Sequence, residues 1–410
     1  MSFLQLLPSS SFEFYGEDGC VFDLLGSARF FLKKEYACFL TELLNGKEYS
    51  RENYPTEFGD LIDGMMNEGM LYKYDKAVYQ EPIKFYSNYA IRGFFDIPPQ
   101  FENFYIEASD KCAYACDFCD MKKVIGGCNS CVKWNRAGKK ASTEKLLETI
   151  QRLLNIHTHA ISILGGDPLL NWDYVSNVIS VVRGKYAEIP IYLYIANLDI
   201  AQEILDYLKA NKVSLKIMVV REKLLVGGQD EGGVNKTYCN KIEHIRKEII
   251  DSQIVPMGVF EDICRIKDVL QSITDSDIMV EAIDYVTLPK TVIPYEKRQQ
   301  LPIDAMFSRK SINRCLNNKI ALSLSGDVTV CPALDDVIVN VCEKEVDEAF
   351  FENGIYERWE MGKENIKDCG KCPMKWLCKD CFSALEMADE KGVGGSYFCG
   401  KRQEKNTVVK

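Results

Sequence analysis

The sequence predicts an α/β protein whose central domain carries a smaller domain at each end. Strand and helix patterns alternate through the middle of the 410 residues, which indicates parallel strands joined by crossover helices. A linker with two adjacent prolines, residues 93–100, precedes this part. The 17 cysteines divide unevenly, and the segment after residue 300 holds eight of them. We therefore expect domains at 1–92, 101–298 and 299–410.

Composition limits the class of protein. The formal net charge is −10, which argues against a nucleic-acid partner. No apolar run approaches the roughly 18 residues that span a bilayer, and the N-terminus lacks the features of a signal peptide. We expect a cytoplasmic protein with no membrane partner. In that reducing compartment clustered cysteines bind metal or do redox chemistry, and with only three histidines the site would be mostly thiolate, which favours zinc or iron–sulfur.

Residues 1–92 have the pattern of a small winged helix, with alternating strands around Gly16–Gly19 and two amphipathic helices. Cys20 and Cys38 stand alone here and are expected to be small buried hydrophobic residues. The expected elements are strands at 12–16 and 20–25, helices at 34–45 and from after Pro55 to Gly69, and a wing of two short strands at 70–80.

The central domain is expected to be either a doubly wound sheet or a partial barrel, and both place chemistry at the carboxyl ends of the strands. Its clearest helix follows Ser142 or Thr143, either of which can cap the free amides. The expected strands are 103–108, 160–164, 189–196, 213–220, 254–260 and 278–286, and the expected helices are 142–156, 172–184, 199–210, 234–251 and 262–274.

Directly after the first of these strands comes a Cys-x3-Cys-x2-Cys motif formed by Cys112, Cys116 and Cys119. Three thiolates can hold three irons of a four-iron cluster and leave the fourth iron open for a substrate or cofactor. The alternatives are a zinc site and a buried group of thiols.

This motif and the strand–helix succession behind it resemble the radical S-adenosylmethionine (radical SAM) enzymes. The resemblance implies a partial (β/α)6 barrel of TIM type, a [4Fe-4S] cluster and S-adenosylmethionine as cofactors. In that family the open iron chelates the cofactor, and an electron from the cluster yields a 5′-deoxyadenosyl radical. The aromatic residue before the third cysteine packs near the adenine, which is Phe118 here.

The strand expected at 160–164 ends in Gly165-Gly166-Asp167-Pro168, which resembles the family's Gly-Gly-Glu-Pro motif. The resemblance implies that Gly165, Gly166 and Asp167 bind the cofactor's ammonium group, although Asp reaches less far than Glu. Further along, Asn197 either reaches the ribose or lies on the surface. Arg221 likewise either reaches the carboxylate or lies on the surface.

Several residues are left outside these motifs. Cys128 and Cys131 form an extra Cys-x2-Cys that could bind metal, form a redox pair or shape a loop. Two further cysteines and two histidines are expected to be packing or surface residues without a role in the site: Cys239, Cys264, His157 and His159.

The C-terminal cysteines resemble the SPASM domain, an extension of radical SAM enzymes that carries two auxiliary four-iron clusters. The resemblance implies that Cys315, Cys331 and Cys381 hold the first cluster, with Cys342 or an open iron completing it. Here the last spacing is two residues where the family has three, and the alternative is a zinc-ribbon-like module. A hairpin turning at Ser325–Asp327 is expected between the first two cysteines. The ligands implied for the second cluster are Cys369, Cys372, Cys378 and Cys399.

The N-terminal pattern resembles the RiPP recognition element, a winged helix that captures the leader of a ribosomally made precursor peptide as an added strand. Together the three parts predict a radical SAM peptide maturase, an oxidoreductase that installs a thioether or carbon–carbon crosslink. Its partners would be a precursor peptide with a leader and an electron donor such as flavodoxin or ferredoxin. One alternative is an anaerobic sulfatase-maturating-type enzyme that oxidises a Cys or Ser in a protein. The other is a non-catalytic, zinc-bound peptide-binding scaffold.

Overall fold

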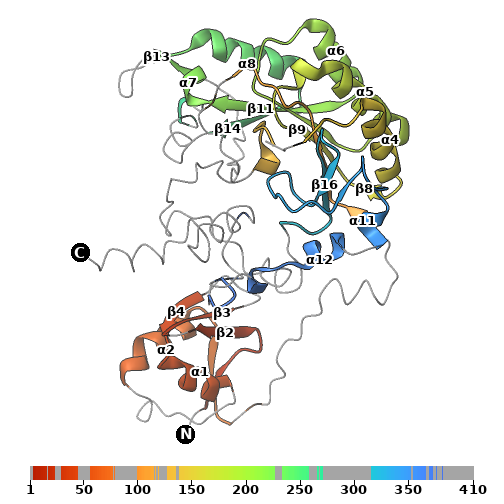
Figure 1. The fold of residues 1–410 in the computed structure, drawn as a ribbon. Coiled ribbons are helices and arrows are strands. Elements are labelled where there is room, and N and C mark those ends of the chain that lie inside the picture. Colours follow the sequence, from red (N-terminus) through yellow and green to blue (C-terminus); the bar gives the residue numbers. More distant parts are fainter. Residues whose placement is uncertain are drawn as a thin grey trace, which may run out of the picture. The chain divides into compact units, whose positions relative to one another are not determined.

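In a computed structural model the chain forms two compact units (Figure 1). One comprises Met1–Ile97, Lys297–Arg314 and Met361–Lys379, and the other Pro98–Glu296, Cys315–Glu360 and Asp380–Lys410. The domain boundaries expected from the sequence remain a prediction. The structure describes residues 3–15, 17–23, 29–44, 56–76, 78, 99–114, 116, 119, 127–134, 138–226, 233–257, 266, 268–270, 315–351, 354–365, 369–372, 375 and 381.

The second unit is built on one mixed sheet, whose order over the described residues is β14-β11-β10-β9-β7-β15-β16-β17. The first five of these strands are parallel, and each lies beside the next one along the chain. This confirms the predicted α/β class. The expected strand at 278–286 lies outside the described residues. The strands are β7 (Asn103–Glu107), β9 (Ile161–Leu164), β10 (Ile191–Ile195), β11 (Val213–Val220), β14 (Gln253–Met257), β15 (Lys319–Leu322), β16 (Asp327–Thr329) and β17 (Val339–Asn340).

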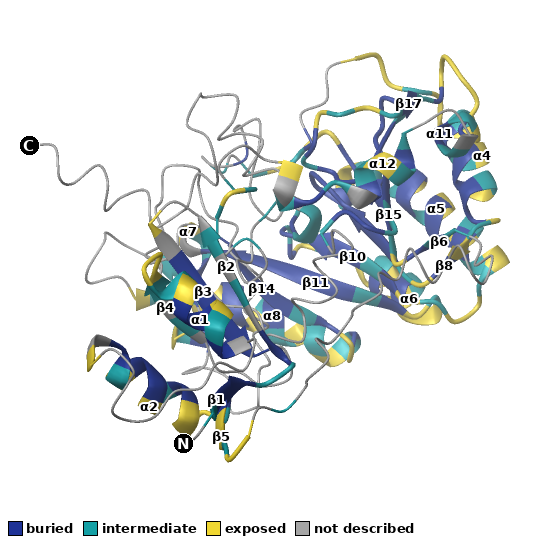
Figure 2. Cartoon of the chain, turned by 90° about the horizontal axis from the view of Figure 1, so that it is seen from below, coloured by how far each residue is buried: buried dark blue, intermediate teal, exposed yellow. Residues whose placement is uncertain are grey.

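Four helices cover one side of the parallel strands (Figure 1), and Figure 2 shows buried residues along the strands and exposed ones on the outward helix faces. In the first helix Ser142 is the N-cap, and its side chain accepts a hydrogen bond from the Lys145 amide at 3.2 Å. No helix in the described part of the chain is both long and apolar enough to cross a bilayer. The helices are α4 (Thr143–Leu153), α5 (Trp172–Lys185), α6 (Gln202–Ala210) and α8 (Lys236–Glu248).

Two helix boundaries predicted from the sequence were wrong because short strands take up the ends. The helix expected to reach residue 156 ends at Leu153, since β8 (His157–Thr158) pairs with β6 (Gln100–Phe101). The helix expected from 234 begins at Lys236, because β13 (Gly233–Val234) pairs with β12 (Leu225–Val226). The Asn235 side chain then caps the helix by accepting from the Tyr238 amide at 3.1 Å.

The predicted C-terminal hairpin is confirmed, and it extends the main sheet. β15 pairs antiparallel with β16 and parallel with β7. At the turn Gly326 has φ +85°, a conformation that favours glycine. The fully buried Trp359 of α12 (Ile355–Glu360) donates its indole N–H to the carbonyl of Lys319, the first residue of β15, at 2.8 Å. A further short helix, α11 (Glu348–Phe351), precedes α12.

The described part of the first unit has its own apolar core, which includes Leu6, Val21, Leu40, Ile62 and Met65. Its strands are β1 (Phe3–Leu6), β2 (Ser10–Tyr15), β3 (Asp18–Asp23), β4 (Arg29–Lys33) and β5 (Leu71–Tyr74), and its helices are α1 (Tyr36–Leu44) and α2 (Gly59–Asn67).

One expectation for this unit was wrong and another is tested only in part. The first half of the expected wing, β5, pairs with β1, while residues 77, 79 and 80 of its second half lie outside the described residues; β2, β3 and β4 form a separate antiparallel sheet. Cys38 is exposed on α1, because its helix turns that position away from the core, whereas Cys20 is buried as expected.

Replacing Ser142 by Ala is expected to lower the free energy of unfolding by about 1 kcal/mol, because the Lys145 amide loses its cap. Chemical denaturation followed by circular dichroism measures this. Ser176→Ala is the matched control, since that hydroxyl lies within α5 and donates to the carbonyl of Asp173. Equal effects of the two changes would contradict the role of the cap.

Candidate active site

The three motif cysteines follow the carboxyl end of β7. Cys119 is buried, and Cys112 and Cys116 are half-buried. Two backbone amides donate to these sulfurs: that of Tyr114 to Cys112 Sγ at 3.4 Å, and that of Lys133 to Cys119 Sγ at 3.5 Å. Hydrogen bonds to sulfur are among the protein's means of tuning iron–sulfur clusters. The local geometry therefore suits thiolate ligands.

The protonation of these thiols depends on burial and on one another. Burial raises the pKa of Cys116 to about 11, and the neighbouring Cys119 and Cys112 act in the same direction. Burial also raises the pKa of Cys112, against the hydrogen bond from the Tyr114 amide, and Asp167 and Cys119 add to the rise. The three sulfurs thus share one electrostatic environment. Because metal ligation needs thiolates, loading a cluster here would release protons.

A glycine loop after β9 packs directly against the loop that carries the first cysteine. Gly166 has φ +61°, and a Cβ there would stand 2.2 Å from the carbonyl oxygen of Ser109 and 2.6 Å from that of Lys111. The Ser109 amide donates to the Gly165 carbonyl at 3.1 Å, and the Asp167 amide to the Lys111 carbonyl at 2.7 Å. Only glycine fits this backbone approach.

Asp167 and Asn197 lie together at the ends of neighbouring strands. Asp167 is buried, and one carboxylate oxygen accepts from the Leu169 amide at 3.0 Å. The other accepts from the side-chain amide of Asn197 at 3.2 Å. The structure therefore joins two residues that the sequence assigned separately to the cofactor.

Two other expected cofactor contacts are not described at the side-chain level. Phe118 lies outside the described residues. Arg221 is the first residue of α7 (Arg221–Leu224), directly after β11, and its side chain lies outside them. Both stay predictions.

Sequence reasoning missed two buried polar groups in this unit. The Trp134 indole N–H is buried and has no hydrogen-bond partner among the described residues; it lies 2.9 Å from where a Cβ on Gly165 would stand. The Tyr238 hydroxyl is also buried without a described partner, and burial raises its pKa. The Trp134 donor beside the glycine loop fits a polar cofactor lying against the backbone. An aromatic residue after a Cys-x2-Cys carries no signal of this in the sequence.

A second group of sulfurs lies in the same unit. The close approach of Cys331 lowers the pKa of Cys128 to about 6, and Cys128 in turn raises the pKa of Cys331. Cys315 and Cys381 lie close enough to raise the pKa of Cys331 further. We call these four residues the Cys331 group: Cys128, Cys315, Cys331 and Cys381.

The other cysteines divide as follows. Cys369 and Cys372 belong to the first unit, where the Cys372 amide donates to the Cys369 carbonyl at 3.0 Å. Cys342 is exposed, and Cys239 is buried on α8 as expected. The remaining sequence-predicted cysteines lie outside the described residues: Cys264, Cys378 and Cys399.

None of the fourteen cysteines in the described residues forms a disulfide. Within the same residues no group of His, Cys, Asp or Glu is tight enough to hold a single metal ion. A four-iron cluster spans more room than one ion, so its thiolates stand further apart.

As expected for surface residues, His157 and His159 are exposed. Their ring centroids lie 4.7 Å apart, and the rings meet edge to face.

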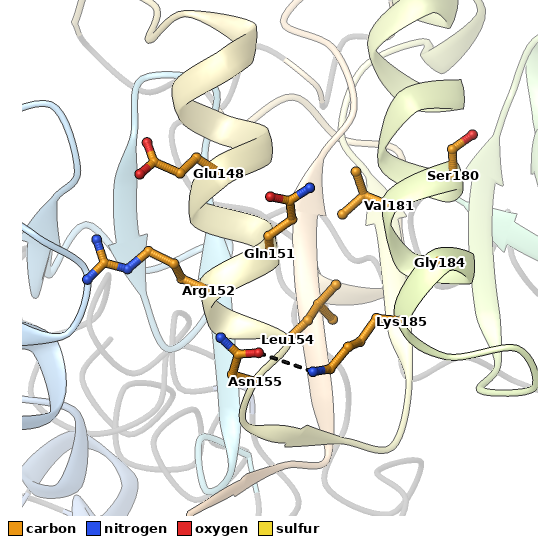
Figure 3. A pocket seen from close by; sticks show the side chains of 9 residues that line it. All are labelled: Glu148, Gln151, Arg152, Leu154, Asn155, Ser180, Val181, Gly184 and Lys185. Atoms are coloured by element: carbon orange, nitrogen blue, oxygen red, sulfur yellow. Dashed lines mark hydrogen bonds between the residues drawn. The ribbon is translucent and has the colours of Figure 1, made fainter.

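A cavity of about 740 Å³ lies away from these sulfurs, between α4 and α5 (Figure 3). Lys185 donates to the side chain of Asn155 at 3.1 Å across it. Its lining comes from the helices and the turn after α4 and holds no cysteine. It therefore takes no part in the site at the strand ends.

Residues 106–273 match the family model of the Radical SAM superfamily. The matched segment starts within β7 and contains the three motif cysteines and the glycine loop. Residues 106–273 therefore match a radical SAM domain, a family that uses S-adenosylmethionine and a four-iron cluster. The three motif cysteines fit a four-iron cluster. The close backbone approach at Gly166 and the unpaired Trp134 indole N–H fit S-adenosylmethionine.

Among solved structures the chain is similar to Streptococcus suis SuiB bound to S-adenosylmethionine, with 14% identity over 96% of this chain and 98% of SuiB and a TM-score of 0.44. It is similar to anSMEcpe with bound AdoMet and a peptide, with 16% identity over 75% of this chain and 95% of anSMEcpe and a TM-score of 0.48. It is also similar to BtrN in complex with AdoMet, with 14% identity over 70% and 94% and a TM-score of 0.37. No curated protein matches the chain.

Replacing Gly166 by Ala is expected to reduce S-adenosylmethionine affinity and iron content. Its positive φ alone costs about 1–3 kcal/mol for a non-glycine residue, and the added Cβ would overlap two carbonyl oxygens. Equilibrium binding and iron analysis of anaerobically prepared protein measure both effects.

Gly184→Ala on α5 is the matched control, because a Cβ there meets nothing within 4 Å. This change should leave cofactor binding unchanged and stabilise the helix by about 0.5–1 kcal/mol. Wild-type affinity and iron content in Gly166→Ala would contradict the role given to the glycine loop.

Proposed function

We propose that this chain is a radical SAM maturase that installs a thioether or carbon–carbon crosslink in a ribosomally made precursor peptide. The observation that carries the proposal is the union, in one chain, of a radical SAM domain with a separate N-terminal module of winged-helix pattern. A module with its own core and open strand edges suits peptide capture, a task that the radical chemistry itself does not need.

The strand edges of the N-terminal module support leader binding. In its three-stranded sheet β3 is central, so β2 and β4 each have one hydrogen-bonding edge without a strand partner among the described residues. A peptide can add to such an edge through main-chain hydrogen bonds, with alternate side chains turned toward the domain. The module would then hold the leader while the core peptide reaches the strand ends of the other unit.

In the radical SAM domain the chain's own residues would bind and orient the cofactor. When bound, the cluster and S-adenosylmethionine supply the 5′-deoxyadenosyl radical that removes a hydrogen from the peptide. Cys112, Cys116 and Cys119 would hold the cluster. The carboxylate of Asp167 would accept hydrogen bonds from the cofactor's ammonium group, with the glycine backbone beside it. Apolar side chains of the inner face, such as Met218 and Val220, would exclude water from the reactive carbon.

Seven of the eight C-terminal cysteines would hold two auxiliary four-iron clusters. These clusters would accept the electron that is released when the new bond forms. We assign Cys315, Cys331 and Cys381 to the first of them. A flavodoxin or ferredoxin would supply the electron that starts each cycle. The ligands assigned to the second auxiliary cluster are Cys369, Cys372, Cys378 and Cys399.

Replacing Cys112, Cys116 and Cys119 together by Ala should abolish cleavage of S-adenosylmethionine. Iron should fall from about twelve to about eight per chain, because the auxiliary ligands lie elsewhere in the sequence. Product chromatography and iron analysis test this. Cleavage that survives the triple change would rule out the assigned cluster.

Deleting residues 1–92 should spare uncoupled cleavage of S-adenosylmethionine, which also serves as the control that the remaining chain folds. Peptide modification at micromolar substrate should fall by roughly a hundredfold, because tethering at an effective concentration of about 1 mM is lost. Mass spectrometry of the peptide measures it.

Free leader should compete with peptide modification by the full chain and leave the truncated chain unaffected. If the truncated chain modifies peptide as well as the full chain does, the leader-capture proposal fails. An enzyme of the sulfatase-maturating type, whose specificity lies in the barrel, would then be favoured.

A further inference from the structure

The extra Cys-x2-Cys after the motif has no role in the site described so far. Its first cysteine lies in a 3₁₀ turn, Gly127–Asn129. Both cysteines pack against the apolar cluster on the inner face of the sheet. Their sulfurs lie in two different environments, so they do not act as one site.

Cys131 lies among the motif cysteines. Its thiol is 3.8 Å from the sulfur of Met257, at the carboxyl end of β14. Burial raises its pKa, and Cys112, Cys119 and Cys116 are the next causes of the rise. This second cysteine of the pair therefore faces the radical SAM site.

Cys128 lies among the C-terminal cysteines instead. Cys128 packs against the apolar cluster that contains Tyr105 and Ala321, and its thiol lies close to Cys331. Tyr105 is buried on β7 and is also close to Cys315. The strand pairing explains this meeting, because Tyr105 lies opposite Ala321 of β15, between the two C-terminal cysteines in the chain.

A half-buried positive charge accompanies these sulfurs. Lys319, the first residue of β15, lies close to Cys315 and Cys128. A four-iron cluster with four thiolates carries net negative charge, and a nearby cation helps to stabilise such a charge in the protein. This arrangement suits a cluster bound by the Cys331 group.

We propose that Cys128 is the fourth thiolate ligand of the auxiliary cluster held by the other three members of the Cys331 group. The assignment rests on the proposed auxiliary clusters. It replaces Cys342, the candidate from the sequence, which is exposed and whose amide donates to its neighbour Asn340 at 2.9 Å. The ligand Cys128 would then stand three positions before Cys131, which faces the radical SAM site.

The test uses the full chain, prepared anaerobically as wild type, Cys128→Ala and Cys342→Ala. Wild type should hold about twelve irons. Cys128→Ala should either lower iron to about eight or replace one auxiliary signal in the electron paramagnetic resonance spectrum by that of a three-iron cluster. The signal of the S-adenosylmethionine-binding cluster should still respond to added S-adenosylmethionine, which shows that the barrel is folded. Cys342→Ala should match wild type.

Three results would overturn the assignment: wild-type iron and spectrum in Cys128→Ala, a loss confined to the S-adenosylmethionine-binding cluster, or a loss in Cys342→Ala instead. Should Cys128→Ala fail to accumulate, Cys128→Ser keeps the volume. Its weaker oxygen ligand should shift the reduction potential of one auxiliary cluster, and an unchanged potential overturns the assignment. Wild-type protein with about four irons would instead refute the auxiliary clusters of the proposed function.

Discussion

The close approach of the Gly166 backbone to the carbonyls of Ser109 and Lys111 is the contact on which the active site depends. It presses the loop after β9 against the loop after β7, so that Asp167 comes to affect the protonation of Cys112. Any side chain at Gly166 would separate the two loops. The sulfurs and the carboxylate would then no longer share one environment, although neither would have been changed.

The sheet extends this constraint to the C-terminal cysteines. Because β15 pairs in parallel with β7, the hairpin between Cys315 and Cys331 belongs to the same sheet as the radical SAM motif. The Glu107 carboxylate, at the end of β7, accepts from the Leu324 amide at 2.7 Å and ties the hairpin to the strand end. The spacing of the two proposed cluster sites would thus depend on the pairing of β15 with β7 and on the hydrogen bond to Glu107.

The N-terminal module is a separate structural unit with a different kind of surface. It has its own core and a sheet whose edges lack strand partners among the described residues, and no residue of the radical SAM motif belongs to it. This separation fits a division in which one part selects the peptide and the other changes it. Selection by an edge strand uses main-chain hydrogen bonds, so it tolerates many leader sequences while alternate side chains set the preference.

The sequence by itself determined the α/β class, the positions of the parallel strands and the two loops of the candidate site. These follow from local signals: hydrophobic periodicity, the capping Ser142, the cysteine spacing and the paired glycines. What it did not show is the non-local pairing. Residues 71–74 pair with the strand at 3–6, a partner that no local pattern could reveal.

Only the tertiary structure decided which cysteines stand together. Cys128 is three residues from Cys131 and about two hundred from Cys331, yet its thiol lies close to Cys331. The reason is physical: the pairing of β15 with β7 brings the C-terminal hairpin beside Tyr105, and the 3₁₀ turn at Cys128 faces that same surface. Spacing along the chain can identify residues able to bind a metal, but the sheet register selects the set that meets.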